Sequence, residues 1–201
     1  MYIDTPRVIT ETAQGFTSCR IVDQMLERRE IVLNDEINAQ RMNSILIQLL
    51  HLEREDSEKG ITLYLDSPGG TVDSALCVID TMKAIGCPVT VINTGMCASM
   101  AAVLFIAADT RMMLPNSRLM FHDPRIPNAS GSALHLRDVA DGLMSMRDTI
   151  AEIIKAHSKL NLEEVFDLTA KDSFLSADRA LELGMTDAIL TKITSKDADG
   201  K

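Results

Sequence analysis

The stretch Gly95-Met96-Cys97-Ala98-Ser99-Met100 lies between an apolar run, residues 89–94, and a helical pattern rich in small residues. An apolar run of this length predicts a buried strand, so the stretch is a strand-to-helix turn. A serine at the start of the helix lies among unpaired backbone N–H groups, where a developing negative charge is stabilised. The turn therefore makes Ser99 a candidate nucleophile. The simpler interpretation, a serine that only caps the helix, is the more frequent one.

Strands and helices alternate on both sides of this turn. Residues 61–65 predict a short buried strand, and Ser67-Pro68-Gly69-Gly70 predicts the turn after it. Apolar residues then recur at helical spacing from Val72 to Ile85. The order strand, turn, helix, strand implies right-handed crossovers, so we expect an α/β fold with a mainly parallel sheet.

A long helical pattern runs roughly from Ala133 to His157, after two short strands at residues 111–114 and 118–121. A helix of that length projects from a compact domain and needs a surface on which to bury its apolar stripe, which suggests a partner subunit. Beyond it we expect two capped helices and a last strand, which begin at Asn161, Ser176 and Thr186.

The composition excludes several classes of function. The chain has 201 residues, of which 46% are hydrophobic and 24% charged, and this suits one domain with a sizeable core. The net charge of −9, without clustered basic residues, argues against nucleic acid as the main partner. No run approaches the length of a membrane span and the first residues do not resemble a secretory signal, so we expect a cytoplasmic protein. The four cysteines lack metal-ligand spacing.

Acyl transfer by a serine needs a base, an acid that orients the base, and two N–H donors for the oxyanion. Three of the four histidines, His51, His135 and His157, lie on predicted helices or their flanks, where histidines are usually surface or capping residues. His122 ends a predicted strand, at the edge where active sites of parallel sheets collect, and is the candidate base. A structural histidine is the common alternative there. Asp123 should not reach the ring of His122 if the strand continues, because successive strand residues point to opposite faces.

Four motifs in order resemble those of the proteolytic subunits of Clp proteases, serine peptidases of the crotonase-like fold. The resemblance runs from about residue 31 to about residue 190, and it implies an α/β fold of βαβ units with a projecting handle helix. It also implies that Ser99 is the nucleophile, His122 the general base and Asp172 the acid. The backbone N–H groups of Gly70 and Met100 would form the oxyanion hole. The motifs are Ser67-Pro68-Gly69-Gly70, Ala98-Ser99-Met100, Leu114-Pro115-Asn116-Ser117-Arg118 with His122, and Phe174-Leu175-Ser176-Ala177.

The resemblance also implies partners and polypeptide substrates. The family assembles as two stacked heptameric rings, a tetradecamer that encloses a proteolytic chamber, and the helix from Ala133 would be the handle by which the rings meet. An AAA+ unfoldase of the Clp type consumes the ATP, so we expect no cofactor and no metal in this chain. One departure is Arg125-Ile126-Pro127-Asn128, which replaces a glycine-rich segment that lies along the substrate. The unfoldase is expected to dock at Thr62, Tyr64, Ala84 and Met112.

The expected function is therefore the serine endopeptidase core of an ATP-dependent protease, which cleaves unfolded polypeptides and short peptides through an acyl-enzyme at Ser99. Two alternatives stay open: a catalytically silent ring subunit that co-assembles with an active paralogue, and an acyl-CoA enzyme of the wider crotonase-like superfamily. We expect an N-terminal segment with an axial loop and a first helix (residues 1–30), a peptidase domain (31–192) with the handle at about 123–159, and a polar tail (193–201).

Overall fold

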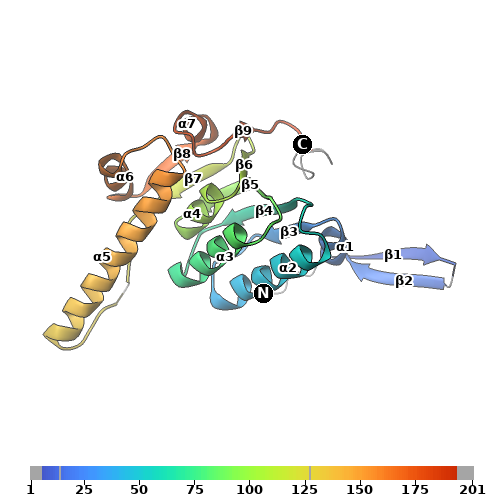
Figure 1. Cartoon of the computed structure of the whole chain (residues 1–201), viewed down its shortest axis with the longest axis horizontal. Coiled ribbons are helices and arrows are strands. Elements are labelled where there is room, and N and C mark those ends of the chain that lie inside the picture. Colours follow the sequence, from blue (N-terminus) through green and yellow to red (C-terminus); the bar gives the residue numbers. More distant parts are fainter. Residues whose placement is uncertain (1–5, 14, 127, 194–201) are drawn as a thin grey trace.

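A mainly parallel sheet forms the centre of the computed structural model, which describes residues 6–13, 15–126 and 128–193 (Figure 1). Its main path has the order β3-β4-β5-β6-β9, and every neighbouring pair on that path is parallel. This confirms the α/β class and the parallel sheet. The strands on the path are β3 (Glu30–Leu33), β4 (Ile61–Ser67), β5 (Val89–Ala98), β6 (Thr110–Met113) and β9 (Ala188–Ile189).

Strand β5 is longer than the sequence predicts and has different partners along its length. Residues 90–93 pair with β6, whereas residues 96–98 pair with β7 (Arg118–Phe121). The register between β4 and β5 shifts between Leu65 and Ser67, an irregularity that redirects the second half of β5. Strand β8 (Ser173–Ser176) then pairs antiparallel with β7. The sheet is thereby extended to the end of β5, where Ser99 follows.

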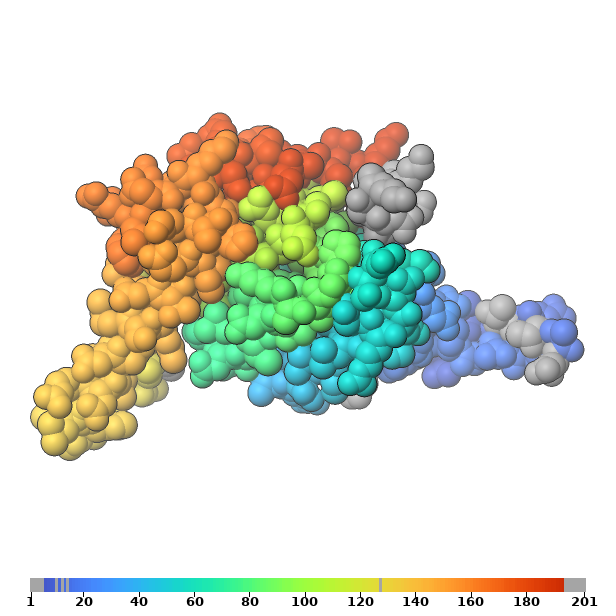
Figure 2. Space-filling model, viewed as in Figure 1, coloured from blue at the N-terminus to red at the C-terminus, as the bar shows by residue number. Residues whose placement is uncertain are grey.

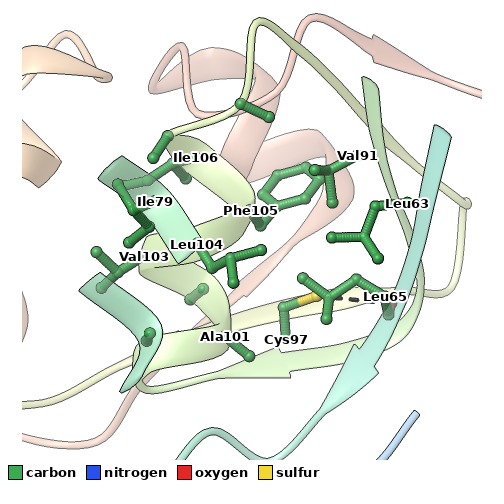
Figure 3. Close-up of a cluster of buried hydrophobic side chains, with 14 of the residues drawn as sticks. Leu63, Leu65, Ile79, Val91, Cys97, Ala101, Val103, Leu104, Phe105 and Ile106 are labelled. Carbon is green, nitrogen blue, oxygen red and sulfur yellow. Dashed lines mark hydrogen bonds between the residues drawn. The ribbon is translucent and has the colours of Figure 1, made fainter. Parts of the chain in front are cut away.

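Three helices pack over one face of the sheet: α2 (Ala39–Glu55), α3 (Val72–Ala84) and α4 (Met100–Ile106). All residues of α4 are buried, because the helix is apolar on every side and lies between α3 and the strands β4 and β5. Figure 3 shows Leu63 and Val91 of these strands beside Phe105 of α4. The core thus fixes the position of the helix that begins directly after Ser99.

Helix α5 (Ala133–Ala156) confirms the predicted long helix and extends well beyond the body of the molecule (Figures 1 and 2). Its only buried residues, Ile150, Ala151 and Ile154, lie in its last two turns. The apolar side chains of Leu134, Leu136 and Met144 are exposed in its first half. No apolar side chain in that half is fully buried in this chain, although Val139 and Leu143 are partly buried.

A two-stranded hairpin projects at the opposite end of the molecule (Figure 2). It consists of β1 (Arg7–Thr12) and β2 (Gly15–Arg20), and α1 (Ile21–Glu27) follows it. The expected N-terminal segment thus contains this hairpin and the first helix, while its residues 1–5 lie outside the described residues. Residues 194–201 of the polar tail and Pro127 of the Arg125–Asn128 segment also lie outside them.

The C-terminal part contains α6 (Leu162–Thr169) and α7 (Ala177–Glu182). Asn161 and Glu164 form the predicted capping box at α6, and Ser176 caps α7. The last strand is shorter than predicted, because only Ala188 and Ile189 pair with β6. Within the described ranges no helix combines the length and the apolar character that a bilayer span requires.

Candidate active site

Ser99 has an unusual backbone conformation, with φ of 54° and ψ of −127°, although it is not a glycine. Residues with side chains rarely adopt this conformation, which costs about 1–3 kcal/mol and persists only where the surroundings enforce it. The Ser99 side chain makes no capping hydrogen bond to α4, so it does not act as an ordinary N-cap. The simpler structural interpretation of this serine is therefore wrong.

The glycines of the Ser67–Gly70 turn let the backbone approach Ser99 closely. A Cβ atom on Gly69 would lie 2.5 Å from the carbonyl oxygen of Ala98 and 2.7 Å from the Cβ of Ser99. A Cβ atom on Gly70 would lie 2.0 Å from the carbonyl oxygen of Ile37. Both glycines also have positive φ, 91° and 148°. Both positions therefore require glycine, because Gly69 lies against Ser99 and Gly70 lies against Ile37.

Two backbone N–H groups are available for an oxyanion beside Ser99. Met100 is the first residue of α4, and its N–H has no acceptor within the helix. Ile37 donates to the carbonyl of Gly69 and accepts from the N–H of Thr71, which turns the N–H of Gly70 away from Ile37. No acceptor for the Gly70 N–H is found among the described residues. The assignment of these two N–H groups to an oxyanion hole stays a prediction.

His122 directly follows β7 and lies in the same small cavity as Ser99. The cavity has a volume of about 20 Å³, which is the space of roughly one water molecule. Its walls come from α3, α4, β7 and the buried end of α5, so the base of the handle helps to form the site. The apolar residues that line it are Val72, Met100, Val103, Phe121, Ile150 and Ile154.

Asp172 directly precedes β8 and His122 directly follows β7, so both lie at the same end of this antiparallel pair. The register pairs Arg118 with Ser176 and Phe121 with Ser173, and its continuation by one residue would set His122 against Asp172. Directly opposed residues of antiparallel strands have their Cβ atoms about 5 Å apart. The topology thus brings Asp172 to the strand end that carries His122, across some fifty residues of intervening chain, which sequence patterns alone could not predict.

The carboxylate of Asp123 is engaged elsewhere, although β7 ends at Phe121 and the strand alternation does not extend to this residue. Its carboxylate accepts hydrogen bonds from Nε of Arg147 at 3.0 Å and from the hydroxyl of Thr169 at 2.6 Å. The Arg147 guanidinium also lies 3.9 Å above the ring of Phe166. Asp123 therefore joins the strand end to α5 and α6 and is not the orienting acid of His122.

Two contacts keep the three residues from forming a complete hydrogen-bonded chain in this structure. His122 Nδ1 lies 2.5 Å from the carbonyl oxygen of Asp123, and the carboxylate of Asp172 pairs with the Arg125 guanidinium. In the described part of the chain no hydrogen bond joins Ser99 to His122 or His122 to Asp172. Apo catalytic contacts are often long and tighten only with substrate. The role of Arg125 was not predicted from the sequence.

Comparison with known proteins decides the family. The Clp protease family model matches residues 13–193. An ATP-dependent Clp protease proteolytic subunit of Ligilactobacillus salivarius is 36% identical over 187 residues, which cover 92% of this chain and 94% of the relative. The chain belongs to the Clp protease family. It is accordingly a serine-type peptidase, and the resemblance seen in the motifs extends over nearly its whole length.

The remaining histidines of this Clp-family chain lie away from Ser99. His51 is exposed and faces Glu55 on α2 at 3.5 Å. His135 lies in the first turn of α5, where its N–H is capped by Ser132. His157 is half-buried, and burial, with help from the charges of Lys83 and Arg111, lowers its pKa from the ordinary value. None of the three lines the Ser99 cavity, whereas His122 does, and the assignment of His122 as the base stays a prediction.

The four expected docking residues lie in different environments. Tyr64 and Met112 lie on the sheet face opposite the helices, with Ile92 between them in the register. Thr62 is on the same face but is 1% exposed, so its side chain is not at the surface of the chain. Ala84 ends α3 in the helical layer. A single copy of the chain does not bring the four together, and the docking assignment stays a prediction.

Cysteines and metal ligands do not form a second site. Among the described residues no group of three or more His, Cys, Asp or Glu side chains could hold a metal ion. Burial raises the pKa of Cys87 to about 11, and the neighbouring Glu53 adds to this effect. Burial also raises the pKa of Cys97, whose thiol contacts the carbonyl of Leu65 (Figure 3). Both thiols are inert packing groups in this fold.

Proposed function

We propose that this Clp-family chain cleaves peptide bonds through an acyl-enzyme on Ser99, with His122 as general base and Asp172 as its orienting acid. The observation that carries the proposal is the combination of a strained serine and an opposed base and acid. Ser99 and His122 line one small cavity and directly follow β5 and β7, and Asp172 directly precedes β8, the antiparallel partner of β7. These positions come from three separate strands, and chance rarely supplies them together.

The steps follow from the positions. Ser99 Oγ attacks the carbonyl carbon of the scissile bond as His122 takes the hydroxyl proton. The carbonyl oxygen becomes negative and accepts hydrogen bonds from the N–H groups of Gly70 and Met100, which are fixed before the reaction and need no rearrangement. His122 then gives the proton to the leaving amine, and a water molecule hydrolyses the ester by the same path in reverse.

We propose that the substrates are unfolded polypeptides and short peptides. Their delivery would depend on an AAA+ unfoldase of the Clp type, which would consume the ATP, so this chain would need no cofactor of its own. We place the complex in the cytoplasm.

We also propose a ring assembly of the stacked heptameric kind, either of this chain alone or mixed with a paralogue. The projecting first half of α5 supports this proposal, since its exposed Leu134, Leu136 and Met144 need a partner surface. The hairpin β1–β2 projects from the other end and is the candidate axial loop. The silent-subunit alternative is not favoured, because all three catalytic positions carry residues competent for the reaction.

A labelling experiment tests the serine mechanism directly. A fluorophosphonate probe should modify the wild-type chain, and mass spectrometry of the digest should place the adduct on Ser99. The Ser99→Ala variant should fold and assemble as the wild type does but lose both labelling and cleavage of a short fluorogenic peptide. Cleavage retained by the purified Ser99→Ala variant, or an adduct on another serine, would refute the proposal.

A further inference from the structure

The orienting acid of the proposed site is held by a cation from the neighbouring segment. Nη2 of Arg125 hydrogen bonds to Oδ1 of Asp172, and the two form an ion pair. The Arg125 side chain is 61% exposed and that of Asp172 is 48% exposed. Arg125 lies only three residues beyond His122, on the chain that leaves β7. The base and the cation thus approach the same carboxylate from one segment.

The antiparallel register indicates that His122 is the alternative partner of the Asp172 carboxylate. His122 is the next residue after Phe121, which pairs with Ser173, and Asp172 directly precedes Ser173. A rotation of the Asp172 side chain therefore suffices to exchange the guanidinium for the imidazole, because opposed residues of this kind lie within reach of each other.

In place of the Asp172 carboxylate, a neutral carbonyl oxygen accepts the hydrogen bond from the His122 ring. Its Nδ1 contacts the carbonyl oxygen of Asp123, and since a carbonyl only accepts, Nδ1 carries the proton and Nε2 is free to act as a base. The ring thus has the correct tautomer without Asp172. A carbonyl, however, stabilises the imidazolium of the transition state less than a carboxylate does. In the state seen here, the imidazolium would therefore be stabilised less than in a state with Asp172 on the ring.

Among the charged residues near Asp172, Arg125 is the one that competes with His122 for its carboxylate. Asp123 cannot replace Asp172, because Arg147 and Thr169 occupy its two oxygens. Lys171 is adjacent to Asp172 in the chain and is exposed, but it forms no ion pair in the described part of the structure. The charge beside Asp172 alone therefore does not withdraw the carboxylate, whereas the direct Arg125 contact does.

We propose that Arg125 is a positioning residue that withholds Asp172 from His122, so that peptide hydrolysis is restrained by an internal ion pair. The inference rests on the proposed function, in which Asp172 is the orienting acid. Arg125 acts only through that acid and takes no part in the bond-making steps. When the ion pair opens, the Asp172 carboxylate can accept a hydrogen bond from Nδ1–H of His122. That bond completes the catalytic triad.

The restraint is expected to be modest and sensitive to salt. Ion pairs between exposed groups shift an equilibrium only by roughly two- to fivefold, and dissolved salt screens them. The Arg125→Gln variant should therefore raise kcat by about two- to fivefold. This factor is the increase in the fraction of molecules in which Asp172 is free to bind His122. KM for a short neutral peptide should not change, since the substitution alters the acid and not the contacts to such a peptide.

The experiment compares wild type, Arg125→Gln, Arg125→Lys and Lys171→Gln as full-length chains, each checked for its assembly state by sedimentation. Peptidase kcat and KM are measured between low and moderate sodium chloride concentrations. Arg125→Lys should retain most of the restraint, because its ammonium group can still pair directly with the Asp172 carboxylate. Lys171→Gln is the charge-matched control and should behave as wild type. In wild type kcat should rise with salt, whereas in Arg125→Gln it should already be high and nearly independent of salt.

The outcomes separate this inference from the proposed function. A fall in kcat of Arg125→Gln would show that Arg125 places Asp172 productively and would overturn the inference. An unchanged kcat with the same salt response as wild type would overturn it as well. In both cases loss of activity in Ser99→Ala would leave the serine mechanism standing. Cleavage retained by Ser99→Ala would overturn the mechanism and, with it, the role given to Arg125.

Discussion

The backbone N–H of Ser99 donates a hydrogen bond of 2.8 Å to the carbonyl oxygen of Met120. Met120 belongs to β7 and lies two residues before His122, so the nucleophile and the base are connected by a short and rigid path. The bond continues the pairing of Ala98 with Met120 at the end of β5. Strain at Ser99 is therefore offset by a sheet contact that also determines where the base lies.

The turn glycine that lies against Ser99 should be intolerant of a side chain. Gly69→Ala would bring a Cβ within 2.7 Å of the Cβ of Ser99 at a φ of 91°, so the turn must move. We expect a loss of peptidase activity of roughly 100-fold or more, because displacement of a nucleophile by about 1 Å costs that much. Gly86→Ala is the matched control, since its Cβ would meet no atom closer than 3.4 Å.

Activity and thermal unfolding of both glycine variants should be measured together. Gly69→Ala should also unfold at a lower temperature than the wild type, whereas Gly86→Ala should retain activity. Equal activity of the Gly69 variant and the wild type would mean that the turn does not position Ser99.

Asp172 and Asp123 offer a direct comparison of two neighbouring acids. Asp172→Asn should lower kcat by about two orders of magnitude or more, because a triad histidine that loses its carboxylate loses both orientation and charge stabilisation. Asp123→Asn should lower the stability of the α5–α6 region through its lost contacts with Arg147 and Thr169, yet keep most of the activity. Peptidase kinetics and thermal unfolding on both variants decide the assignment. The reverse order of effects on kcat would identify Asp123 as the acid.

His157 should make the stability of the chain depend on pH. Its pKa in the folded state lies below the ordinary value of 6.5, chiefly because burial disfavours the charged ring. The unfolded chain therefore binds the proton more readily, and stability falls as the pH drops below about 6.5 towards the folded-state pKa. His157→Gln should lose less stability between pH 7.5 and pH 5.5, a range of about two units around that value.

Chemical unfolding at the two pH values, with exposed His135→Gln as the control, measures this difference. If His157→Gln and wild type lose the same free energy of unfolding on acidification, the burial of His157 does not contribute to the pH dependence.

The sequence predicted those parts of the site that depend on local pattern. The turn around Ser99 follows from an apolar strand and a small-residue helix, and His122 follows from its place at a strand end. Asp172 came only from the family resemblance, because its position depends on the pairing of β7 with β8, which are far apart in the chain. The contact between Arg125 and Asp172 depends on the same pairing and on side-chain rotamers. No periodicity in the sequence encodes either of them.

The exposed half of α5 should be required for assembly and not for folding. Leu136 lies on the same face of α5 as the buried Ile150, since close to four full turns separate the two residues. The side chain of Leu136 is 40% exposed. Leu136→Glu would place a charge on that face and remove an apolar contact worth about 1.5–3 kcal/mol where a partner covers it. Ser145→Glu places the same charge on the opposite side of the helix and is the control. Analytical ultracentrifugation should show smaller assemblies only for Leu136→Glu, with circular dichroism unchanged for both. If both variants sediment as wild type does, the stripe of α5 is not an assembly surface and the handle proposal is wrong.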